Sequence, residues 1–476
     1  MSVRIEHDFL GEKAVPAEAY YGIQTLRATE NFPVTGTPVS PHLMTALAEI
    51  KKASALANME TGMLPKTIGF EIVQAAEEAA AGKLSAHFIV DAIQGGAGTS
   101  INMNMNEVLA NRALERLGKR KGDYFHCSPN NHVNMSQSTN DTVPTAIRIA
   151  AYRLAEPLLA AVAALEAGFA RKAEEFDNVL KMGRTHLQDA VPIRLGQEFG
   201  AYARVIGRDL ARITAAAAGL LTVNLGATAV GTGLNANLRY SELAVRNLIQ
   251  QTGLPLTAAD DLVDATQNTD AFTALSAALK IMAVNLSKIC NDLRLMASGP
   301  RAGLGEIQFP PKQPGSSIMP GKVNPVMAEM VNQIAFQVIG NDHTICLAAE
   351  AGQFELNVMG PVLAHNLLQS LLILRNGLNV FLREAVEGIQ ANEETCRLHV
   401  ERSFGVMTAL NPHLGYETAA RLVKEALQSG QTIKEICLER NLLTPEELDV
   451  ILNPFEMTTP GIAGLEYLEN FDKGAK

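Results

Sequence analysis

The amino-acid sequence predicts a mainly α protein with a central bundle of long helices. In three stretches, apolar side chains recur at alternating steps of three and four residues, which is the spacing of one helix face. One stripe comprises Phe272, Leu275, Leu279, Met282, Leu286, Ile289 and Leu293, and similar stripes cover residues 195–220 and 367–381. Such helices need partners on more than one face, and identical subunits would supply them most simply.

The size and charge of the chain narrow the kinds of protein it can be. A prior of roughly 150 residues per domain suggests about three domains for this chain of 476 residues. Its 40 basic and 50 acidic side chains leave a net charge of −10, and it has no Trp. A nucleic-acid surface needs clustered positive charge and aromatic side chains that stack on bases, so we expect no nucleic-acid partner.

The first two predicted domains differ in their patterns. Residues 1–140 mix short helical patterns with turn-rich segments, and we expect an N-terminal domain that is mixed but mainly helical. Two of its loops, residues 94–100 and 136–141, have unusual polar sequences. Helical periodicity dominates from 141 to 393, which we assign to the central long-helix bundle.

Segment 299–325 interrupts the central bundle. It holds eleven Gly or Pro residues among 27. A structureless stretch of this length inside a compact domain is usually either a functional lid or disorder. The residues in its second half decide between the two, and they favour a catalytic loop.

Residues 315–325 read Gly-Ser-Ser-Ile-Met-Pro-Gly-Lys-Val-Asn-Pro. The glycines let backbone N–H groups turn inward, two hydroxyls and an amine lie nearby, and the helix that follows presents its positive N-terminal end. This pattern indicates an anion-binding loop. It is not a nucleotide-binding P-loop, because five residues rather than four separate Gly315 from Gly321 and Val323 replaces the Ser or Thr that would hold magnesium.

Residues 394–476 are expected to form a small C-terminal helical domain. Two capping boxes predict the starts of short helices there, one made by Thr432 with Glu435 and one by Thr444 with Glu447. The second box has Pro445 at the first helical position, where proline is favoured.

The cysteines and the hydropathy of the chain predict its compartment. Five scattered cysteines without a C-x-x-C pair favour a reducing compartment and argue against a disulfide framework or a structural zinc site. The first residues contain no apolar signal segment, and no run approaches 18 apolar residues. We therefore expect a soluble, cytoplasmic protein with no membrane partner.

Four sequence blocks together resemble those of the fumarase/aspartase superfamily. The loop at 315–325 resembles its signature, and the other blocks are residues 95–107, 132–140 and 183–189, in the same order along the chain. The sequences Gly-Gly-Ala-Gly-Thr-Ser and Ser-Thr-Asn in the first two blocks are similar to those of the aspartases rather than those of the class II fumarases. Gly360 departs from the Glu that the aspartase pattern leads us to expect there.

The resemblance implies a carbon–nitrogen lyase of the ammonia-lyase type. Such an enzyme reversibly deaminates L-aspartate to fumarate and ammonia through Cβ proton abstraction and an enediolate (aci-carboxylate) intermediate. The alternative is a class II fumarase, which hydrates fumarate to L-malate. A helical scaffold without activity ranks third, because it predicts damage at the reactive positions and Ser316, Lys322, Asn324 and His186 are all present.

The resemblance also implies roles for single residues. Ser316 would be the catalytic base that takes the Cβ proton. The implied substrate-binding residues are Thr99, Ser138, Thr139 and Ser317 for the β-carboxylate, Lys322 and Asn324 for the α-carboxylate, and Asn140, Thr185 and His186 for the amino group. Donors aimed at a carboxylate that becomes a dianion would stabilise the transition state. Taken alone, Ser316 and Ser317 would more often be turn or cap residues before a helix.

Finally, the resemblance implies a three-domain protomer in a homotetramer, with each active site built from blocks of three subunits. The partners would be small molecules, namely L-aspartate, fumarate and ammonium. No residue is expected to bind an organic cofactor or a metal, and activation by a divalent cation such as Mg²⁺ is an option within the family.

Overall fold

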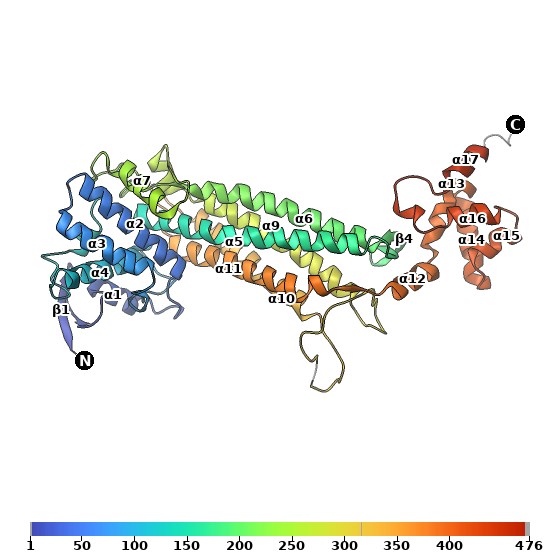
Figure 1. Ribbon diagram of the computed structural model, residues 1–476, viewed down its shortest axis with the longest axis horizontal. Helices are drawn as coiled ribbons and strands as arrows, with labels where there is room; N and C mark the ends of the chain where they lie inside the picture. Colours follow the sequence, from blue (N-terminus) through green and yellow to red (C-terminus); the bar gives the residue numbers. More distant parts are fainter. Residues whose placement is uncertain (1, 316, 472–476) are drawn as a thin grey trace. The chain divides into compact units, whose positions relative to one another are not determined.

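The fold is mainly helical, as the sequence predicts. The computed structural model describes residues 2–315 and 317–471, and its course can be followed from the N-terminus to the C-terminus in Figure 1. The chain divides into two compact units. The first comprises residues 1–161, 209–284 and 334–376, and the second comprises residues 162–208, 285–333 and 377–476. The division into domains 1–140, 141–393 and 394–476 stays a prediction.

The first unit begins with a hairpin and continues with helices that carry one part of the candidate site. Strand β1 (Val3–Asp8) pairs antiparallel with β2 (Gly11–Pro16). The helices and strands that belong wholly to this unit are then α1 (Ile23–Asn31), α2 (Pro41–Glu60), α3 (Lys66–Ala80), α4 (Thr99–Arg116), β5 (Thr222–Val223), α7 (Tyr240–Thr252), β6 (Thr257–Ala258) and α8 (Leu262–Gln267). Helix α2 packs against α3 and α7, and β5 pairs with β6 in parallel.

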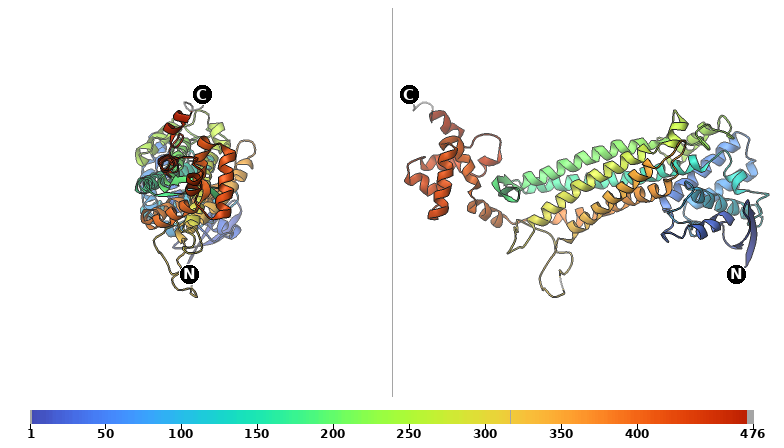
Figure 2. Two further views of the ribbon diagram at one scale, coloured as in Figure 1. Left: turned by 90° about the vertical axis from the view of Figure 1, so that its right-hand side faces the viewer. Right: turned by 180° about the vertical axis from the view of Figure 1, so that it is seen from behind.

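Long helices form the centre of both units. They are α5 (Thr139–Glu175), α6 (Leu195–Ala218), α9 (Asp270–Met296), α10 (Val326–Glu350) and α11 (Gly360–Glu384). Each contributes residues to both units, and within each unit they lie side by side (Figures 1 and 2).

The predicted apolar stripes face the interior. Every member of the α9 stripe is at most 2% exposed, and the stripe of α11 is equally buried. In the second unit, the ring centroid of Phe169 on α5 lies 6.1 Å from that of Phe199 on α6 and 6.5 Å from that of Phe381 on α11. Tilted and edge-on ring pairs of this kind add to the stabilisation from buried apolar area.

The second unit holds a hairpin and a long irregular segment. Strand β3 (Leu180–Thr185) pairs antiparallel with β4 (Gln188–Arg194) between α5 and α6. Within segment 299–325, the short strand β7 (Ile307–Gln308) pairs antiparallel with β8 (Gln390–Ala391). The described residues from 309 to 325 form no helix or strand. The predicted loop therefore has a paired stem at 307–308.

The C-terminal part of the second unit consists of short helices. They are α12 (Glu393–Arg402), α13 (Asn411–Leu414), α14 (Tyr416–Ser429), α15 (Ile433–Glu439), α16 (Pro445–Ile451) and α17 (Leu465–Phe471). Both predicted capping boxes are confirmed, at the starts of α15 and α16. Leu422 on α14, Ile436 on α15 and Leu448 on α16 are buried in one shared core.

One helix among the described residues, α9, is long and apolar enough to cross a membrane by length and composition alone. Half of its most apolar window is buried inside the protein. The core helix of a soluble protein meets the same two criteria, so this helix is weak evidence for a membrane span. The five cysteines are free thiols.

Candidate active site

The first sequence block ends in a turn that begins helix α4. Gly96, Ala97 and Gly98 have φ angles of 91°, 59° and 92°, so three consecutive residues lie in the left-handed region. A Cβ atom on Gly98 would also lie 3.0 Å from a methyl group of Val143 on α5. Residue 98 is therefore a glycine for two reasons: glycine adopts the positive φ angle without strain, and it has no Cβ atom to clash with Val143. The turn leaves Thr99 exposed as the first residue of α4.

The second block forms the N-terminus of α5. The backbone N–H of Ser138 donates to Asp141 Oδ1 at 3.0 Å, and Ser138 Oγ accepts a hydrogen bond from the N–H of Asn140 at 3.2 Å. Ser138 therefore caps the helix that Thr139 begins, in line with the ordinary role of serine at this position. Asn140 Nδ2 donates to the carbonyl oxygen of Ala229 at 2.7 Å.

A hydrogen bond joins the two helix starts. Asn102, in the first turn of α4, donates through Nδ2 to Thr139 Oγ1 at 3.2 Å. The same amide donates to Asn134 Oδ1 at 3.1 Å. The N-termini of α4 and α5 therefore meet within the first unit and bring Thr99, Ser138 and Thr139 to one place. Two positive helix ends with hydroxyl donors suit a bound carboxylate.

A buried lysine supports this arrangement. Lys51 on α2 is fully buried, and its Nζ lies 3.1 Å from Asn134 Oδ1 and 2.9 Å from Gln137 Oε1. Burial lowers the pKa of Lys51 to about 7, although the nearby Asp141 opposes this shift. Burial likewise raises the pKa of Asp141 to about 6, against hydrogen bonds from backbone N–H groups. Because the charged forms are desolvated, this cluster is sensitive to substitution.

Sequence reasoning missed Lys51. The signal that could have found it is its spacing on α2, where it lies four residues after Leu47 and seven before Asn58, all of them buried. Residues at this spacing lie on the same face of a helix. Because that face of α2 is buried, a lysine on it is buried as well. Buried lysines require polar partners, but this spacing does not identify them.

The third block is the tip of the β3–β4 hairpin. Thr185 pairs with Gln188, so His186 and Leu187 form a two-residue turn. Their φ angles are 55° and 61°, and positive values at both positions are those of a type I′ turn. Asn and Gly usually occupy such turns, so His and Leu hold a strained backbone here. Both side chains are exposed, as is Thr185.

The fourth block lies in the irregular segment of the second unit. The catalytic base implied by the resemblance, Ser316, lies outside the described residues. Ser317 and Lys322 are exposed, and Lys322 has no ion-pair partner among the residues that the structure describes. The carbonyl oxygen of Asn324 accepts a hydrogen bond from the N–H of Val326, the first residue of α10. The helix that the sequence predicts after this loop therefore begins at Val326.

The predicted residues fall into three groups. Thr99, Ser138, Thr139 and Asn140 lie in the first unit, and the side-chain hydrogen bond described above joins their two segments. The second unit carries Thr185 with His186 on one segment, and Ser317 with Lys322 and Asn324 on another. Within the described part of the chain, no hydrogen bond joins residues 183–189 directly to residues 315–325. The sharing of sites between subunits stays a prediction.

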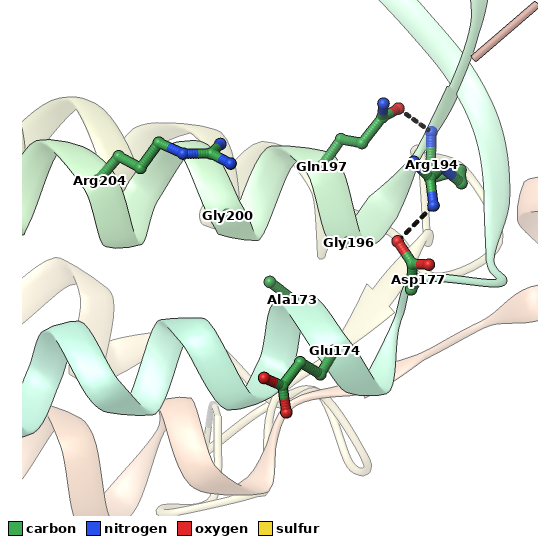
Figure 3. A pocket seen from close by; sticks show the side chains of 8 residues that line it. All are labelled: Ala173, Glu174, Asp177, Arg194, Gly196, Gln197, Gly200 and Arg204. Carbon is green, nitrogen blue, oxygen red and sulfur yellow. Dashed lines mark hydrogen bonds and ion pairs between the residues drawn. The ribbon is translucent and has the colours of Figure 1, made fainter. Parts of the chain in front are cut away.

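Two cavities differ in their relation to these groups. A cavity of about 30 Å³ in the first unit is lined by Asn140, Arg148 and Gly360, among others. A larger cleft of about 570 Å³ lies in the second unit between the end of α5 and the start of α6 (Figure 3). There Arg194 pairs with Asp177 at 2.5 Å. None of the predicted site residues lines the larger cleft.

Comparison with known proteins identifies the family. Residues 11–340 match a family model described as Lyase, and residues 406–459 match one described as Fumarase C C-terminus. The chain is 63% identical over 466 residues to an aspartate ammonia-lyase of Bacillus subtilis (strain 168), and the match covers 98% of each chain.

Solved structures show the same likeness. A fumarate lyase:delta crystallin from Brucella melitensis, bound to cobalt, is 49% identical with a TM-score of 0.92, covering 96% of this chain and 100% of that chain. A class II fumarase from Schistosoma mansoni is 36% identical with a TM-score of 0.93 and the same coverage. Because the lyase model covers more than half of the sequence and the relatives match nearly all of it, the chain belongs to the fumarase/aspartase superfamily of lyases.

Proposed function

We propose that this protein is an aspartate ammonia-lyase, which reversibly converts L-aspartate to fumarate and ammonia. One observation carries the proposal: the relatives named aspartate ammonia-lyase are 48% to 63% identical to it over nearly the whole chain. The class II fumarase among the solved structures is 36% identical to this chain, and the first two sequence blocks resemble those of aspartases. The fumarase alternative is therefore less well supported.

The chemistry requires a site that stabilises negative charge. Removing the Cβ proton of L-aspartate places a second negative charge on the β-carboxylate, which becomes an enediolate. The electron pair of the enediolate then forms the C=C bond of fumarate while the C–N bond breaks, and the nitrogen leaves as ammonia with the electron pair of that bond. Hydrogen-bond donors fixed around the β-carboxylate before the reaction lower the barrier to the first step.

The joined starts of α4 and α5 support a role as this carboxylate clamp. Thr99, Ser138 and Thr139 lie at two positive helix ends. Oγ1 of Thr139 accepts a hydrogen bond from Nδ2 of Asn102. The hydroxyl proton of Thr139 is therefore free to point toward a bound carboxylate oxygen. We assign Ser317 to the same carboxylate on the resemblance.

The remaining assignments also rest on the resemblance. Lys322 and Asn324 would hold the α-carboxylate, and Asn140, Thr185 and His186 would orient the amino group for departure. The exposure of Thr185, His186 and Lys322 supports these roles, because their polar atoms are available to a ligand. Ser316, outside the described residues, would take the Cβ proton. A serine oxygen becomes a competent base where N–H groups and a cation stabilise its anion.

We also propose that the enzyme is a homotetramer whose active sites are shared between subunits. Large apolar side chains on the long helices support burial against other copies. Val284 on α9 is 51% exposed, and Phe336 and Leu347 on α10 are 63% and 56% exposed. Apolar side chains that recur along exposed helix faces mark a protein–protein contact. Light scattering of the purified protein tests the assembly.

No cofactor takes part in the proposed steps. Among residues 2–315 and 317–471, no group of three or more His, Cys, Asp or Glu side chains has the arrangement of a metal site. We assign no step to a metal. Activation by Mg²⁺ stays a prediction, which chelation followed by Mg²⁺ titration would test. A soluble, cytoplasmic location is part of the same proposal.

Two measurements test the function. The purified protein is incubated with L-aspartate, and the absorbance of the new C=C bond is followed. In the reverse direction, fumarate is supplied with or without ammonium, and the products are separated. We expect aspartate only when ammonium is present, and malate without aspartate would establish the fumarase alternative. Replacing Ser316 with Ala should abolish turnover and leave the assembly intact, whereas full activity would place the base elsewhere.

A further inference from the structure

A fully buried carboxylate lies at the stem of the irregular loop. Glu306 directly precedes strand β7, and its side chain is 0% exposed. Its backbone is held on both sides, because its N–H donates to Met296 O at 2.8 Å and its carbonyl oxygen accepts from the N–H of Asn392 at 2.8 Å. Desolvating a carboxylate is costly unless charged partners surround it. The partners of Glu306 therefore decide what it does.

Three cationic or titratable side chains converge on this carboxylate. Arg184 Nη1 donates to Glu306 Oε1 at 2.7 Å. Lys181 Nζ lies 3.1 Å from Glu306 Oε2. The two groups form an ion pair, but their geometry is not that of a hydrogen bond. His399 Nδ1 lies 3.2 Å from Glu306 Oε1. All of these residues belong to the second unit, and they come from the β3–β4 hairpin and from helix α12.

The charges in this cluster balance. Lys181 also binds both carboxylate oxygens of Glu198 on α6, at 2.8 and 3.0 Å. Two carboxylates therefore face two basic side chains, and none of the four side chains is more than 21% exposed. Burial, together with the negative charge of Glu306, raises the pKa of Glu198. Removing one negative charge would leave a buried positive charge without compensation.

The connections of Glu306 lead to two parts of the candidate site. Arg184 immediately precedes Thr185 and His186, the residues proposed to orient the amino group. On its other side, Glu306 begins the stem from which the chain continues to Ser317 and Lys322. The carboxylate of Glu306 thus binds the hairpin next to its tip, through Arg184, and lies at the stem of the catalytic loop. It also contacts His399 on α12.

We propose that Glu306 is a positioning residue that holds the Thr185–His186 hairpin and the stem of the catalytic loop in one arrangement. The inference rests on the proposed function, because the two parts it joins are assigned through that function. Glu306 acts on the reaction only through Arg184 and the loop stem. Its loss should therefore reduce the rate of the chemical step, because the hairpin tip and the catalytic loop both take part in it. The effect on KM should be smaller, because the part of the β-carboxylate clamp on α4 and α5 does not depend on Glu306.

The test compares two substitutions in the same cluster. Glu306→Gln keeps the shape of the side chain and removes the charge that Arg184 requires. Glu198→Gln makes the same change on the other side of Lys181, and Glu198 contacts neither Arg184 nor His399 among the described residues. We expect Glu306→Gln to lower kcat for L-aspartate at least tenfold and to change KM less than threefold. Glu198→Gln should lower kcat less than threefold, even where both variants lose similar thermal stability.

Further variants keep the proposal testable if Glu306→Gln does not fold. Glu306→Asp retains the charge on a side chain shorter by one methylene group, and should recover part of the lost kcat. Arg184→Lys keeps the cation but not the forked geometry of the guanidinium, and should lower kcat as well. On α12, His399→Gln removes the ring contact, whereas Arg397→Gln removes only exposed ion pairs with Glu394 and Glu401 and serves as its control.

The outcomes separate the two proposals. If the wild-type protein does not deaminate L-aspartate, the proposed function fails. If the wild type is active but Glu306→Gln and Glu198→Gln lower kcat equally, or if Glu306→Gln raises KM with kcat unchanged, the positioning role is wrong. Equal activity of Glu306→Asp and Glu306→Gln at matched stability would also overturn it, because the charge would then have no part in catalysis.

Discussion

Asn102 and Thr139 are joined by a hydrogen bond of 3.2 Å between Nδ2 and Oγ1, so the first turns of α4 and α5 are held together by side chains. Asn106, one turn further along α4, also donates to Asn134 Oδ1 at 3.1 Å but makes no bond to Thr139 among the described residues. The two asparagines therefore offer a matched pair for testing the carboxylate clamp.

Replacing Asn102 with Ala should weaken substrate binding. Thr139 would lose the donor that orients its hydroxyl, and one neutral hydrogen bond contributes about 0.5–1.5 kcal/mol. We expect KM for L-aspartate to rise roughly two- to tenfold. Steady-state kinetics of Asn102→Ala and Asn106→Ala measure the effect, and the second variant should change KM less than twofold. Equal changes in both would mean that Thr139 is not oriented by Asn102.

Replacing Leu187 with Gly should stabilise the protein. Leu187 has a φ of 61° in the two-residue turn, where a side chain with a Cβ costs roughly 1–2 kcal/mol and glycine costs little. After the entropy that glycine loses on folding, we expect a gain of about 0.5–1 kcal/mol in the free energy of unfolding. Denaturant unfolding measures it. Leu187→Ala keeps the Cβ and should show no gain, so equal stability of the two variants would contradict the strain.

Replacing Lys51 with Met should change how stability depends on pH. The pKa of Lys51 is lowered to about 7 in the folded chain, while its ordinary value is 10.5. Between these values the unfolded chain binds more protons at this amine, so the free energy of unfolding rises with pH, by at most about 1.4 kcal/mol per pH unit. Asp141 titrates below this window, because its pKa of about 6 is raised from 3.8.

Denaturant unfolding between pH 7 and 10 checks this prediction. The slope of stability against pH should be shallower for Lys51→Met than for the wild type. Lys52→Met is the matched control, because Lys52 is the next residue on α2 and forms a partly exposed ion pair with Glu77 at 2.8 Å. Identical slopes in the wild type and Lys51→Met would show that Lys51 titrates normally.

Replacing Thr444 with Ala should destabilise the C-terminal helices. Thr444 Oγ1 accepts a hydrogen bond from the N–H of Glu447 at 3.2 Å, and the Glu447 side chain accepts one from the N–H of Thr444 at 2.7 Å. Loss of an N-cap costs about 0.5–2 kcal/mol. Hydrogen exchange of the amides in α16 should accelerate accordingly. Thr444→Ser keeps the hydroxyl and should exchange at nearly the wild-type rate.

Several features of the fold and site could be predicted from the sequence because they depend on neighbours along the chain. The stripe on α9 repeats with the period of a helix, and a residue at that spacing is buried whichever partner covers it. The capping boxes at Thr432 and Thr444 involve residues three positions apart. The glycines at 96 and 98 mark positive φ angles, which are local properties of the backbone.

Other features were decided only by tertiary structure. Sequence spacing gave no sign that Lys51 contacts Asn134 and Gln137, more than 80 residues away, or that Arg184 binds Glu306, 122 residues away. The strained turn at His186 was also hidden, because its residue types are unusual for a type I′ turn. Periodicity states which face of a helix is buried, but the partner of a buried charge depends on which segments the packed chain brings together.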